Sequence, residues 1–284
     1  ANGAVAEILH ADGTRSERAF DILVGADGIH SALRQQFYPD EGAPRWNGMM
    51  MWRGTTLARP FLDGRTMVQA GHRRAKFVVY PIEPVRPDGL QRINWICDRR
   101  LREDGFGGGL TAPSREDWSK PGSLDDLLPT FGSWRFAWLD VPGLIRAAEQ
   151  ILEWPMVDRD PLPRWRHGHT TLLGDAAHPM YPIGSNGATQ AILDAAALAD
   201  ALDGHASITA ALNAYEAARL PMTRDIVAMN RREGLDAILD MVEEAAPEGF
   251  ARIEDVTDPT VLAEWVQAYK KAAGHQVGRP QSAP

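Results

Sequence analysis

The feature that most constrains the fold is the segment from residue 172 to residue 202, LLGDAAHPMYPIGSNGATQAILDAAALADAL. A short apolar run, Thr170 to Leu173, leads into it and predicts a buried strand. A glycine-rich loop follows, and then small and apolar residues repeat at helical spacing until Gly204, which suits a C-terminal cap. The repeating residues are Ala188, Ala191, Ile192, Ala195, Ala199 and Leu202. This order of strand, loop and helix is typical of an α/β unit.

The residue types in this loop suit a ligand that is held close to the backbone. Gly174 ends the strand and has no side chain that would keep a ligand away. Asp175 offers two acceptor oxygens, which suit the hydroxyls of a sugar or sugar alcohol. Pro182 fixes the path of the chain, and residues 184–187 lead into a helix N-terminus whose N–H groups favour an electron-rich atom. A flavin has both groups, a hydroxylated ribityl chain and an electron-rich ring edge. The alternative is that Asp175 only caps the helix.

A second loop has the same plan. In DILVGADGIHSALR, residues 21–34, a buried strand ends at Gly25, Asp27 and Gly28 follow, and residues 31–37 predict a short helix. Asp27 would hold a hydroxyl, a backbone turn or a water, and Arg34 would meet a phosphate. Taken alone, the loop is equally an Asp-Gly turn followed by a solvated arginine. Two such loops in one chain indicate one extended ligand.

Between the loops, Trp46 to Arg100 predicts an antiparallel sheet, because short β-forming runs alternate with Gly, Pro and Asp. Its side chains would form the wall of a flat aromatic pocket or, alternatively, ordinary sheet core. The pocket candidates are Met49, Met50, Met51, Trp52, Tyr80 and Trp95, with Tyr181 from the glycine loop. The candidates for anchoring a substrate carboxylate, otherwise solvated, are Arg53, Arg73, Arg74 and Lys76.

Composition excludes several classes of function. The net charge of -8 and the pI of about 5.5 argue against nucleic acid as a partner. Cys97 is the only cysteine, so a disulfide within the chain is impossible and a reducing cytoplasm is expected. No apolar run is long enough to span a bilayer. Neither a serine-nucleophile elbow nor metal-spaced His/Cys residues occur, and we interpret His178 as a structural residue of its loop.

The two loops together resemble the fingerprint pair of the FAD-dependent aromatic hydroxylases, the single-component flavoprotein monooxygenases with the para-hydroxybenzoate hydroxylase fold. The segments WRG (52–54) and YEAARLP (215–221) and the strand end at Tyr80-Pro81 also match positions of that family. Within the family, MYPIGSNGATQAILD is most similar to the phenazine-modifying monooxygenases, although residues 184–187 replace the more usual G-x-G. The resemblance covers the chain to about Gly234.

The resemblance implies an enzyme that uses FAD, NAD(P)H and O2 to hydroxylate an aromatic substrate, such as an N-heterocyclic acid, through a C4a-hydroperoxyflavin. The flavin would carry the chemistry, so no catalytic side chain and no metal are expected. Asp175, with its neighbours Gly174 and Ala176, would bind the ribityl chain, and Pro182 would line the reaction site. The flavin ring would face the backbone of Gly184, Ser185, Asn186, Gly187 and Ala188. The pyrophosphate and the pyridine-nucleotide path would lie near Asp27, Gly28 and Arg34.

One departure from the family matters. Its members begin with a strand–GxGxxG–helix unit that holds the ADP half of FAD, and this chain has none. The run GFGGGL, residues 105–110, has the wrong spacing and lies in a polar stretch. We therefore expect the chain to be a fragment that lacks the ADP-binding N-terminal part and binds FAD poorly by itself.

The predicted fold is mixed α/β: the C-terminal portion of a Rossmann-like FAD-binding domain, an antiparallel-sheet substrate domain and C-terminal helices. The predicted divisions are 1–45 and 164–234 for the FAD-binding domain, 46–163 for the substrate domain and 235–284 for a helical tail. Two alternatives for function stay open: a reductase or halogenase on the same flavin fold, or a non-catalytic binding module with an incomplete FAD site. The substrate, the choice of NADH or NADPH and the oligomeric state stay undetermined.

Overall fold

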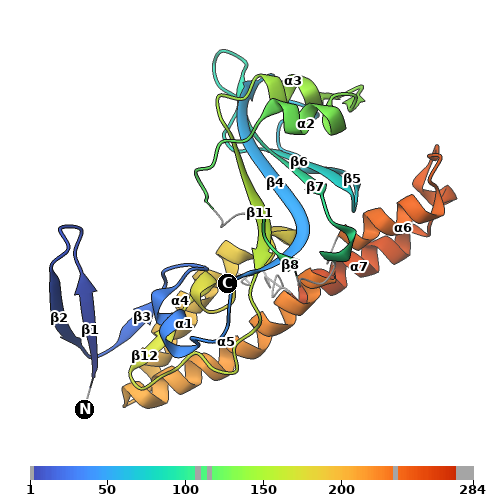
Figure 1. Cartoon of the computed structure of the whole chain (residues 1–284). Coiled ribbons are helices and arrows are strands. Elements are labelled where there is room, and N and C mark those ends of the chain that lie inside the picture. Colours follow the sequence, from blue (N-terminus) through green and yellow to red (C-terminus); the bar gives the residue numbers. More distant parts are fainter. Residues whose placement is uncertain (1–2, 106–109, 114–116, 233–235, 273–284) are drawn as a thin grey trace. The chain divides into compact units, whose positions relative to one another are not determined.

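The computed structural model of the chain describes residues 3–105, 110–113, 117–232 and 236–272 (Figure 1). The glycine run GFGGGL falls largely outside these ranges. The chain divides into two compact units. Unit 1 contains Ala1–Arg45, Val157–Leu235 and Asp258–Pro284, and unit 2 contains Trp46–Met156 and Asp236–Thr257. Residues 157–163, expected in the substrate domain, therefore group with unit 1, and residues 236–257, expected in the tail, group with unit 2.

Two short strands of unit 1 pair in parallel, as an α/β unit requires. These are β3 (Leu23–Gly25) and β12 (Thr170–Leu172), with Leu23 opposite Thr170 and Gly25 opposite Leu172. Helix α1 (Ala32–Phe37) follows β3, and the Ser31 hydroxyl caps its N-terminus. The N-terminal strand β1 (Ala4–Leu9) forms a hairpin with β2 (Arg15–Phe20). The two predicted strands and the short helix are thus confirmed, but β3 is only partly buried, since Val24 is 37% exposed.

Two helices of unit 1 bury apolar side chains against β12 and its loop, and a third contacts the second of them. They are α4 (Gly187–Gly204), α5 (Ile208–Arg231) and α7 (Pro259–Ala272). Pro221, a residue type that commonly ends or kinks a helix, lies inside α5, which continues to Arg231. Buried side chains on both sides of the proline, among them Leu220 and Ile226, stabilise the continuous helix by more than the missing hydrogen bond costs.

Unit 2 contains the expected antiparallel sheet. Its strand order is β11-β4-β7-β6-β5, and β8 also pairs with β4. The pairs β4–β7, β7–β6 and β6–β5 are antiparallel. The strands are β4 (Arg45–Ala58), β5 (Val68–His72), β6 (Ala75–Pro81), β7 (Gln91–Arg100), β8 (Leu110–Thr111) and β11 (Ile151–Asp158).

Between residues 124 and 151 the chain forms short elements rather than one long helix. It contains α2 (Leu124–Phe131), the small hairpin β9 (Arg135–Phe136) and β10 (Leu139–Asp140), and α3 (Val141–Arg146). Pro142 lies in the first turn of α3 and does not interrupt a helix, because its fixed φ suits that turn.

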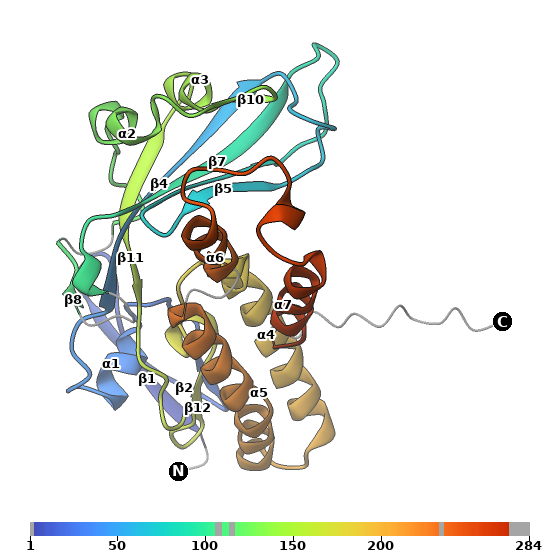
Figure 2. The same ribbon diagram turned by 90° about the vertical axis from the view of Figure 1, so that its right-hand side faces the viewer.

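Helix α6 (Ala237–Ala245) lies beside β5 (Figure 2). Short 3₁₀ turns are η1 (Glu103–Gly105), η2 (Gly174–Ala176), η3 (Ile183–Ser185) and η5 (Ile253–Asp255).

The sheet of unit 2 has two faces with different surroundings. On the first, called the helix face, Trp52 lies opposite Cys97 and Phe77, and Gly54 lies opposite Trp95. This face packs on α2 and α3: the Phe77 and Phe131 rings are 6.4 Å apart, and the Thr56 hydroxyl donates to the Leu144 carbonyl at 2.7 Å. On the second, called the Asp98 face, the register aligns Met51, Asp98 and Lys76.

The close approach of Gly54 and Trp95 generates a test of the sheet. A Cβ on Gly54 would lie 2.3 Å from Cζ2 of the fully buried Trp95 ring. Gly54→Ala should therefore lower the free energy of unfolding by about 1–3 kcal/mol, measured by urea denaturation. Gly204→Ala is the control, because nothing lies within 4 Å of its added methyl group. An unchanged unfolding midpoint for Gly54→Ala would contradict the packing described.

Candidate functional site

The two glycine loops lie side by side at the ends of neighbouring strands. Since β3 and β12 are parallel and adjacent, their carboxyl ends share one edge, and the Leu173 N–H donates to the Gly25 carbonyl at 2.9 Å. The Arg34 guanidinium on α1 reaches the second loop and donates to the carbonyls of Ala176 and Ala177 at 3.1 and 2.9 Å. The two loops that the sequence singled out are therefore one surface, as an extended ligand requires.

Arg34 is the clearest correction to the predicted ligand contacts. Its side chain is only 1% exposed, and Glu41 pairs with it, accepting from Nε at 2.8 Å. The Arg34 Nη2 also donates to the Asp160 carbonyl at 2.8 Å. With its five N–H groups occupied inside the protein, the guanidinium has none left for a phosphate. Its role is to join α1 to the second loop.

In the first loop the structure places Asp27 and Gly28 at a tight turn. Gly28 has a φ of 79°, a conformation that favours glycine. The Asp27 Oδ2 atom accepts from the Ala32 N–H at 2.7 Å, at the first residue of α1. Of the three roles open to Asp27, the structure thus shows the bond to backbone. The carboxylate remains exposed.

The second loop holds its carboxylate at the surface between buried neighbours. Gly174 has a φ of 60°, and a Cβ there would lie 3.1 Å from the Ala191 Cβ, so the loop packs tightly on α4. Asp175 is exposed and has no hydrogen-bond partner among the residues that the structure describes, while Gly174 and Ala176 are buried. Desolvation by the surrounding chain, opposed by the nearby His178, raises the pKa of the Asp175 carboxyl. Its Oδ1 would lie 3.9 Å from a Cβ built on Gly187.

The far end of the loop presents backbone. Pro182 is exposed, and Gly184 and Ser185 take positive φ values of 74° and 54°. Helix α4 then begins at Gly187 without a side-chain cap on its N-terminus. The N–H groups of its first turn have no acceptor within the helix. A carboxylate beside an uncapped helix N-terminus, both lined by glycine, fits a flavin with its ribityl chain.

Asp194 holds this loop from behind, and sequence reasoning missed it. Its fully buried carboxylate accepts from the Gly174 N–H at 3.0 Å and from the Arg219 Nε at 2.7 Å. The His178 Nε2 lies 2.5 Å from the same carboxylate. The structural role predicted for His178 is thereby confirmed. Two features of the sequence could have indicated this ion pair: an aspartate in an otherwise alanine-rich helix, and the arginine of YEAARLP.

The pocket candidates do not lie on one face of the sheet. Trp52 and Trp95 lie on the helix face, where the Trp95 Nε1 donates to the Thr56 hydroxyl at 3.1 Å and Arg99 stacks over the Trp52 ring. They are core residues of the sheet, as the alternative interpretation held. Met51 and Tyr80 lie on the Asp98 face. Tyr181 belongs to unit 1 and is 1% exposed, and burial raises the pKa of its hydroxyl.

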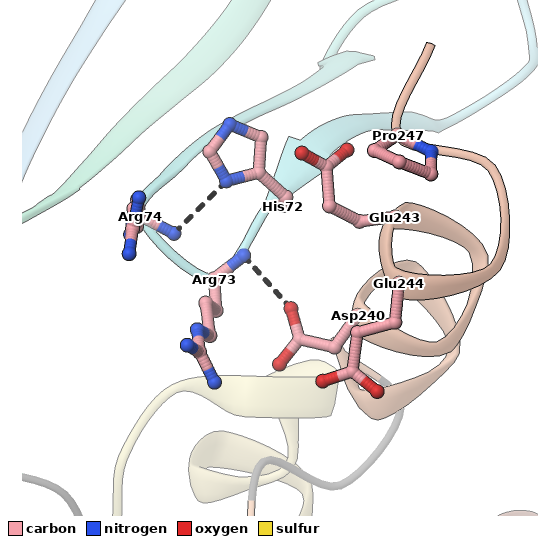
Figure 3. Close-up of a pocket in the computed structure, with 7 residues that line it drawn as sticks. All are labelled: His72, Arg73, Arg74, Asp240, Glu243, Glu244 and Pro247. Carbon is pink, nitrogen blue, oxygen red and sulfur yellow. Dashed lines mark hydrogen bonds between the residues drawn. The ribbon is translucent and has the colours of Figure 1, made fainter. Parts of the chain in front are cut away.

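The four basic candidates also differ in their surroundings. Lys76 is buried and paired with Asp98 and Asp236, and Arg74 pairs with Glu103 at 3.1 Å. Arg53 is exposed and donates through Nε to the Asn94 amide oxygen at 2.7 Å. Arg73 lines a cleft of about 260 Å³ between the β5–β6 turn and α6 (Figure 3). The walls of this cleft are His72, Arg73 and Arg74 on one side and Asp240, Glu243, Glu244 and Pro247 on the other.

Within the part of the chain that the structure describes, no helix combines the length and the apolar character needed to cross a membrane. Across the same residues, no group of three or more His, Cys, Asp or Glu side chains is arranged to hold a metal ion.

Comparison with known proteins places these features in context. Residues 142–230 match the family described as FAD binding domain. The chain is 48% identical over 211 residues to a phenazine 1,6-dicarboxylic acid hydroxylase of Lysobacter antibioticus, covering 74% of this chain and 50% of that protein. It is 38% identical over 229 residues to a 3-amino-4-hydroxybenzoate 2-monooxygenase of Streptomyces platensis, covering 79% and 52%. The chain thus spans about half the length of these curated relatives.

Solved structures show the same fold. The crystal structure of Klebsiella pneumoniae HpxO complexed with FAD and uric acid aligns with 96% of this chain and 60% of that one, with a TM-score of 0.62 and 24% identity. A salicylate hydroxylase substrate complex aligns with 94% and 67%, with a TM-score of 0.62 and 22% identity. The predicted mixed α/β fold of the FAD-dependent hydroxylases is thereby confirmed.

The position of Asp194 generates a stability prediction. Asp194→Ala leaves the buried Arg219 without its carboxylate partner, so we expect a loss of about 3–5 kcal/mol in the free energy of unfolding, measured by urea denaturation. Asp200→Ala, on an exposed position of the same helix, is the matched control and should change it by less than about 0.5 kcal/mol. Equal effects of the two substitutions would contradict the role given to Asp194.

The same carboxylate predicts a pH dependence. Burial raises the pKa of Asp194, but the hydrogen bonds from His178, Arg219 and the Gly174 N–H outweigh it and leave the pKa below its ordinary value. The stability gained from this shift is present in full above the unfolded pKa, about 3.9, and is lost as pH falls towards the folded one. The difference in unfolding free energy between the wild type and Asp194→Asn should therefore shrink below about pH 4. Denaturant titrations from pH 7 to pH 3 measure it, and a constant difference would contradict the assignment.

Proposed function

We propose that this chain, which is homologous to FAD-dependent aromatic hydroxylases over the residues it shares with them, supplies the flavin-binding loops and the substrate-binding sheet of a monooxygenase acting on an aromatic acid. The observation that carries the proposal is the pair of glycine loops at the ends of β3 and β12, held together by Arg34. The names of the relatives, which include hydroxylases of a phenazine dicarboxylic acid and of an aminohydroxybenzoate, support the substrate class.

The residues of the second loop suit the two ends of a flavin. Asp175, exposed and without a hydrogen-bond partner in the described part of the chain, would accept hydrogen bonds from the ribityl hydroxyls. The uncapped N-terminus of α4, from Gly187, would offer N–H groups to the electron-rich edge of the ring. Pro182 and Gly184 would border the reacting side of the ring, and Asp27 and Gly28 would lie towards the pyrophosphate.

When bound, FAD would take electrons from NAD(P)H and activate O2, so no protein nucleophile is required. The protein's part is to bind and orient the aromatic substrate and to keep water from the reacting atoms. Unit 2 would perform this with the Asp98 face of its sheet, where Met51 and Tyr80 lie. A reducing cytoplasm suits a chain whose one cysteine, Cys97, is buried and free. The relatives described above give no support to a reductase, a halogenase or a non-catalytic module.

The activity is tested with the protein expressed from its whole reading frame. NADH or NADPH oxidation should be stimulated by aromatic acids in the presence of FAD and O2, and the product should contain one added hydroxyl group, detected by mass spectrometry. Stimulation by aliphatic compounds alone would contradict the proposal.

Asp175→Ala tests the flavin-binding role of the loop. The substitution removes an exposed carboxylate without an internal partner, so thermal stability should stay nearly unchanged. The loss of hydrogen bonds to a charged acceptor, about 1.5–3 kcal/mol, should raise the FAD dissociation constant about 10-fold or more. Fluorescence titration of FAD measures it, with Asp203→Ala at the exposed far end of α4 as the control. An FAD affinity within twofold of the wild type would remove Asp175 from the site.

A further inference from the structure

The Asp98 face of the unit 2 sheet has polar side chains at both ends, and two apolar side chains beside Arg53 between them. The register aligns Thr55, Asn94 and Tyr80 in one row and Met51, Asp98 and Lys76 in another. The row between them contains Arg53, Ile96 and Val78. Neighbouring rows on one face are two residues, or about 7 Å, apart, so the two polar rows, which have one row between them, are separated by about 13 Å.

At one end, Asp98 has an acceptor atom with no partner. Its side chain is 2% exposed, and its Oδ2 pairs with the Lys76 ammonium at 3.0 Å. Its Oδ1 has no hydrogen-bond partner among the described residues. A buried carboxylate oxygen without a donor is costly, which makes it a place where a ligand's N–H or O–H group binds favourably.

At the other end, Asn94 has a donor with no partner. Its side chain is fully buried, and its Oδ1 accepts from the Arg53 Nε at 2.7 Å. Because Arg53 is only a donor, this bond fixes the amide orientation and turns Nδ2 to the other side. The Asn94 Nδ2 has no acceptor within the described part of the chain. The adjacent guanidinium adds positive charge, so an anionic oxygen suits this end best.

We propose that Asn94 and Asp98 orient the substrate along β7, and that they select an aromatic acid carrying a hydrogen-bond donor, such as an amino group, a hydroxyl or a ring N–H, across the ring from its carboxylate. The carboxylate binds the Asn94 Nδ2 beside Arg53, and the donor binds the Asp98 Oδ1. The inference rests on the proposed function, since it names the substrate class of the same activity.

The middle row suits an aromatic ring. Ile96 and Val78 give an apolar floor between the two polar ends. Arg53 is exposed, and Ile96 and Tyr80 retain part of their surface, so the face can be reached by a ligand. The separation of about 13 Å between the two polar rows leaves room for a ring with polar substituents at opposite ends and a hydrogen bond of about 3 Å at each of them, whereas an unsubstituted ring would not reach both rows.

Binding selectivity tests the inference independently of catalysis. Dissociation constants for benzoate, 4-aminobenzoate and aniline would be measured by calorimetry on the protein from its whole reading frame, saturated with FAD. The wild type should bind 4-aminobenzoate about 10-fold more tightly than benzoate, because one hydrogen bond to a charged group is added. In Asp98→Asn the amide oxygen stays with Lys76 and an NH2 group replaces Oδ1, so this preference should disappear.

Two further variants separate recognition from structure. Asp236→Asn removes the other carboxylate beside Lys76 but leaves the Asp98 Oδ1 unchanged, so the preference should persist. Asn94→Leu should weaken the binding of benzoate and of 4-aminobenzoate about 10-fold and leave the binding of aniline unchanged. Equal binding of benzoate and 4-aminobenzoate by the wild type, or loss of the preference in Asp236→Asn, would overturn the inference. Aromatic-stimulated NAD(P)H oxidation by that same protein would then still support the proposed function, whereas its absence would count against the function itself.

Discussion

The buried carboxylate of Asp194 joins three segments of unit 1 that are far apart in the sequence. Gly174 begins the loop after β12, His178 lies within that loop, and Arg219 comes from the middle of α5. Each partner donates to one carboxylate, so the loop, α4 and α5 are tied at a single point. A charge this deeply buried is tolerated only when such donors surround it. The conformation of the glycine loop therefore depends on a residue that no ligand needs to touch.

Arg34 does for the first loop what Asp194 does for the second. Its guanidinium binds Glu41 on one side and the carbonyls of Ala176 and Ala177 on the other. These internal groups satisfy one another, and among the described residues the Asp175 carboxylate has no hydrogen-bond partner and the N-terminus of α4 has no side-chain cap. The polar groups that face outwards are thus held in place by polar groups that face inwards. Such support is what allows a binding site to keep its geometry before the ligand arrives.

The sequence predicts the local elements well and the internal ion pairs poorly. Strand, glycine loop and helix follow from periodicity and from glycine, which act over a few residues. Which charged residue turns inward depends on partners elsewhere in the chain: Arg34 lies 142 residues from Ala176, and Asp194 lies 25 from Arg219. The sequence alone predicts that Met51 and Trp52 lie on opposite faces of the sheet, because adjacent strand residues point to opposite faces. The face on which Trp95 lies could not be predicted from the sequence, because it depends on the register between β4 and β7.

The two buried aspartates show how hydrogen bonding separates support from recognition. Both oxygens of Asp194 are used, one by Arg219 and the other by Gly174 and His178. Asp98 uses one oxygen for Lys76 and has no partner for the other within the described residues. Folding alone explains the first arrangement, because every acceptor it buries is compensated. It does not explain the second, in which a costly acceptor and the unpartnered donor of Asn94 lie on the same face of one strand. A group that binds both compensates that cost, and this makes the Asp98 face a recognition surface rather than a part of the core.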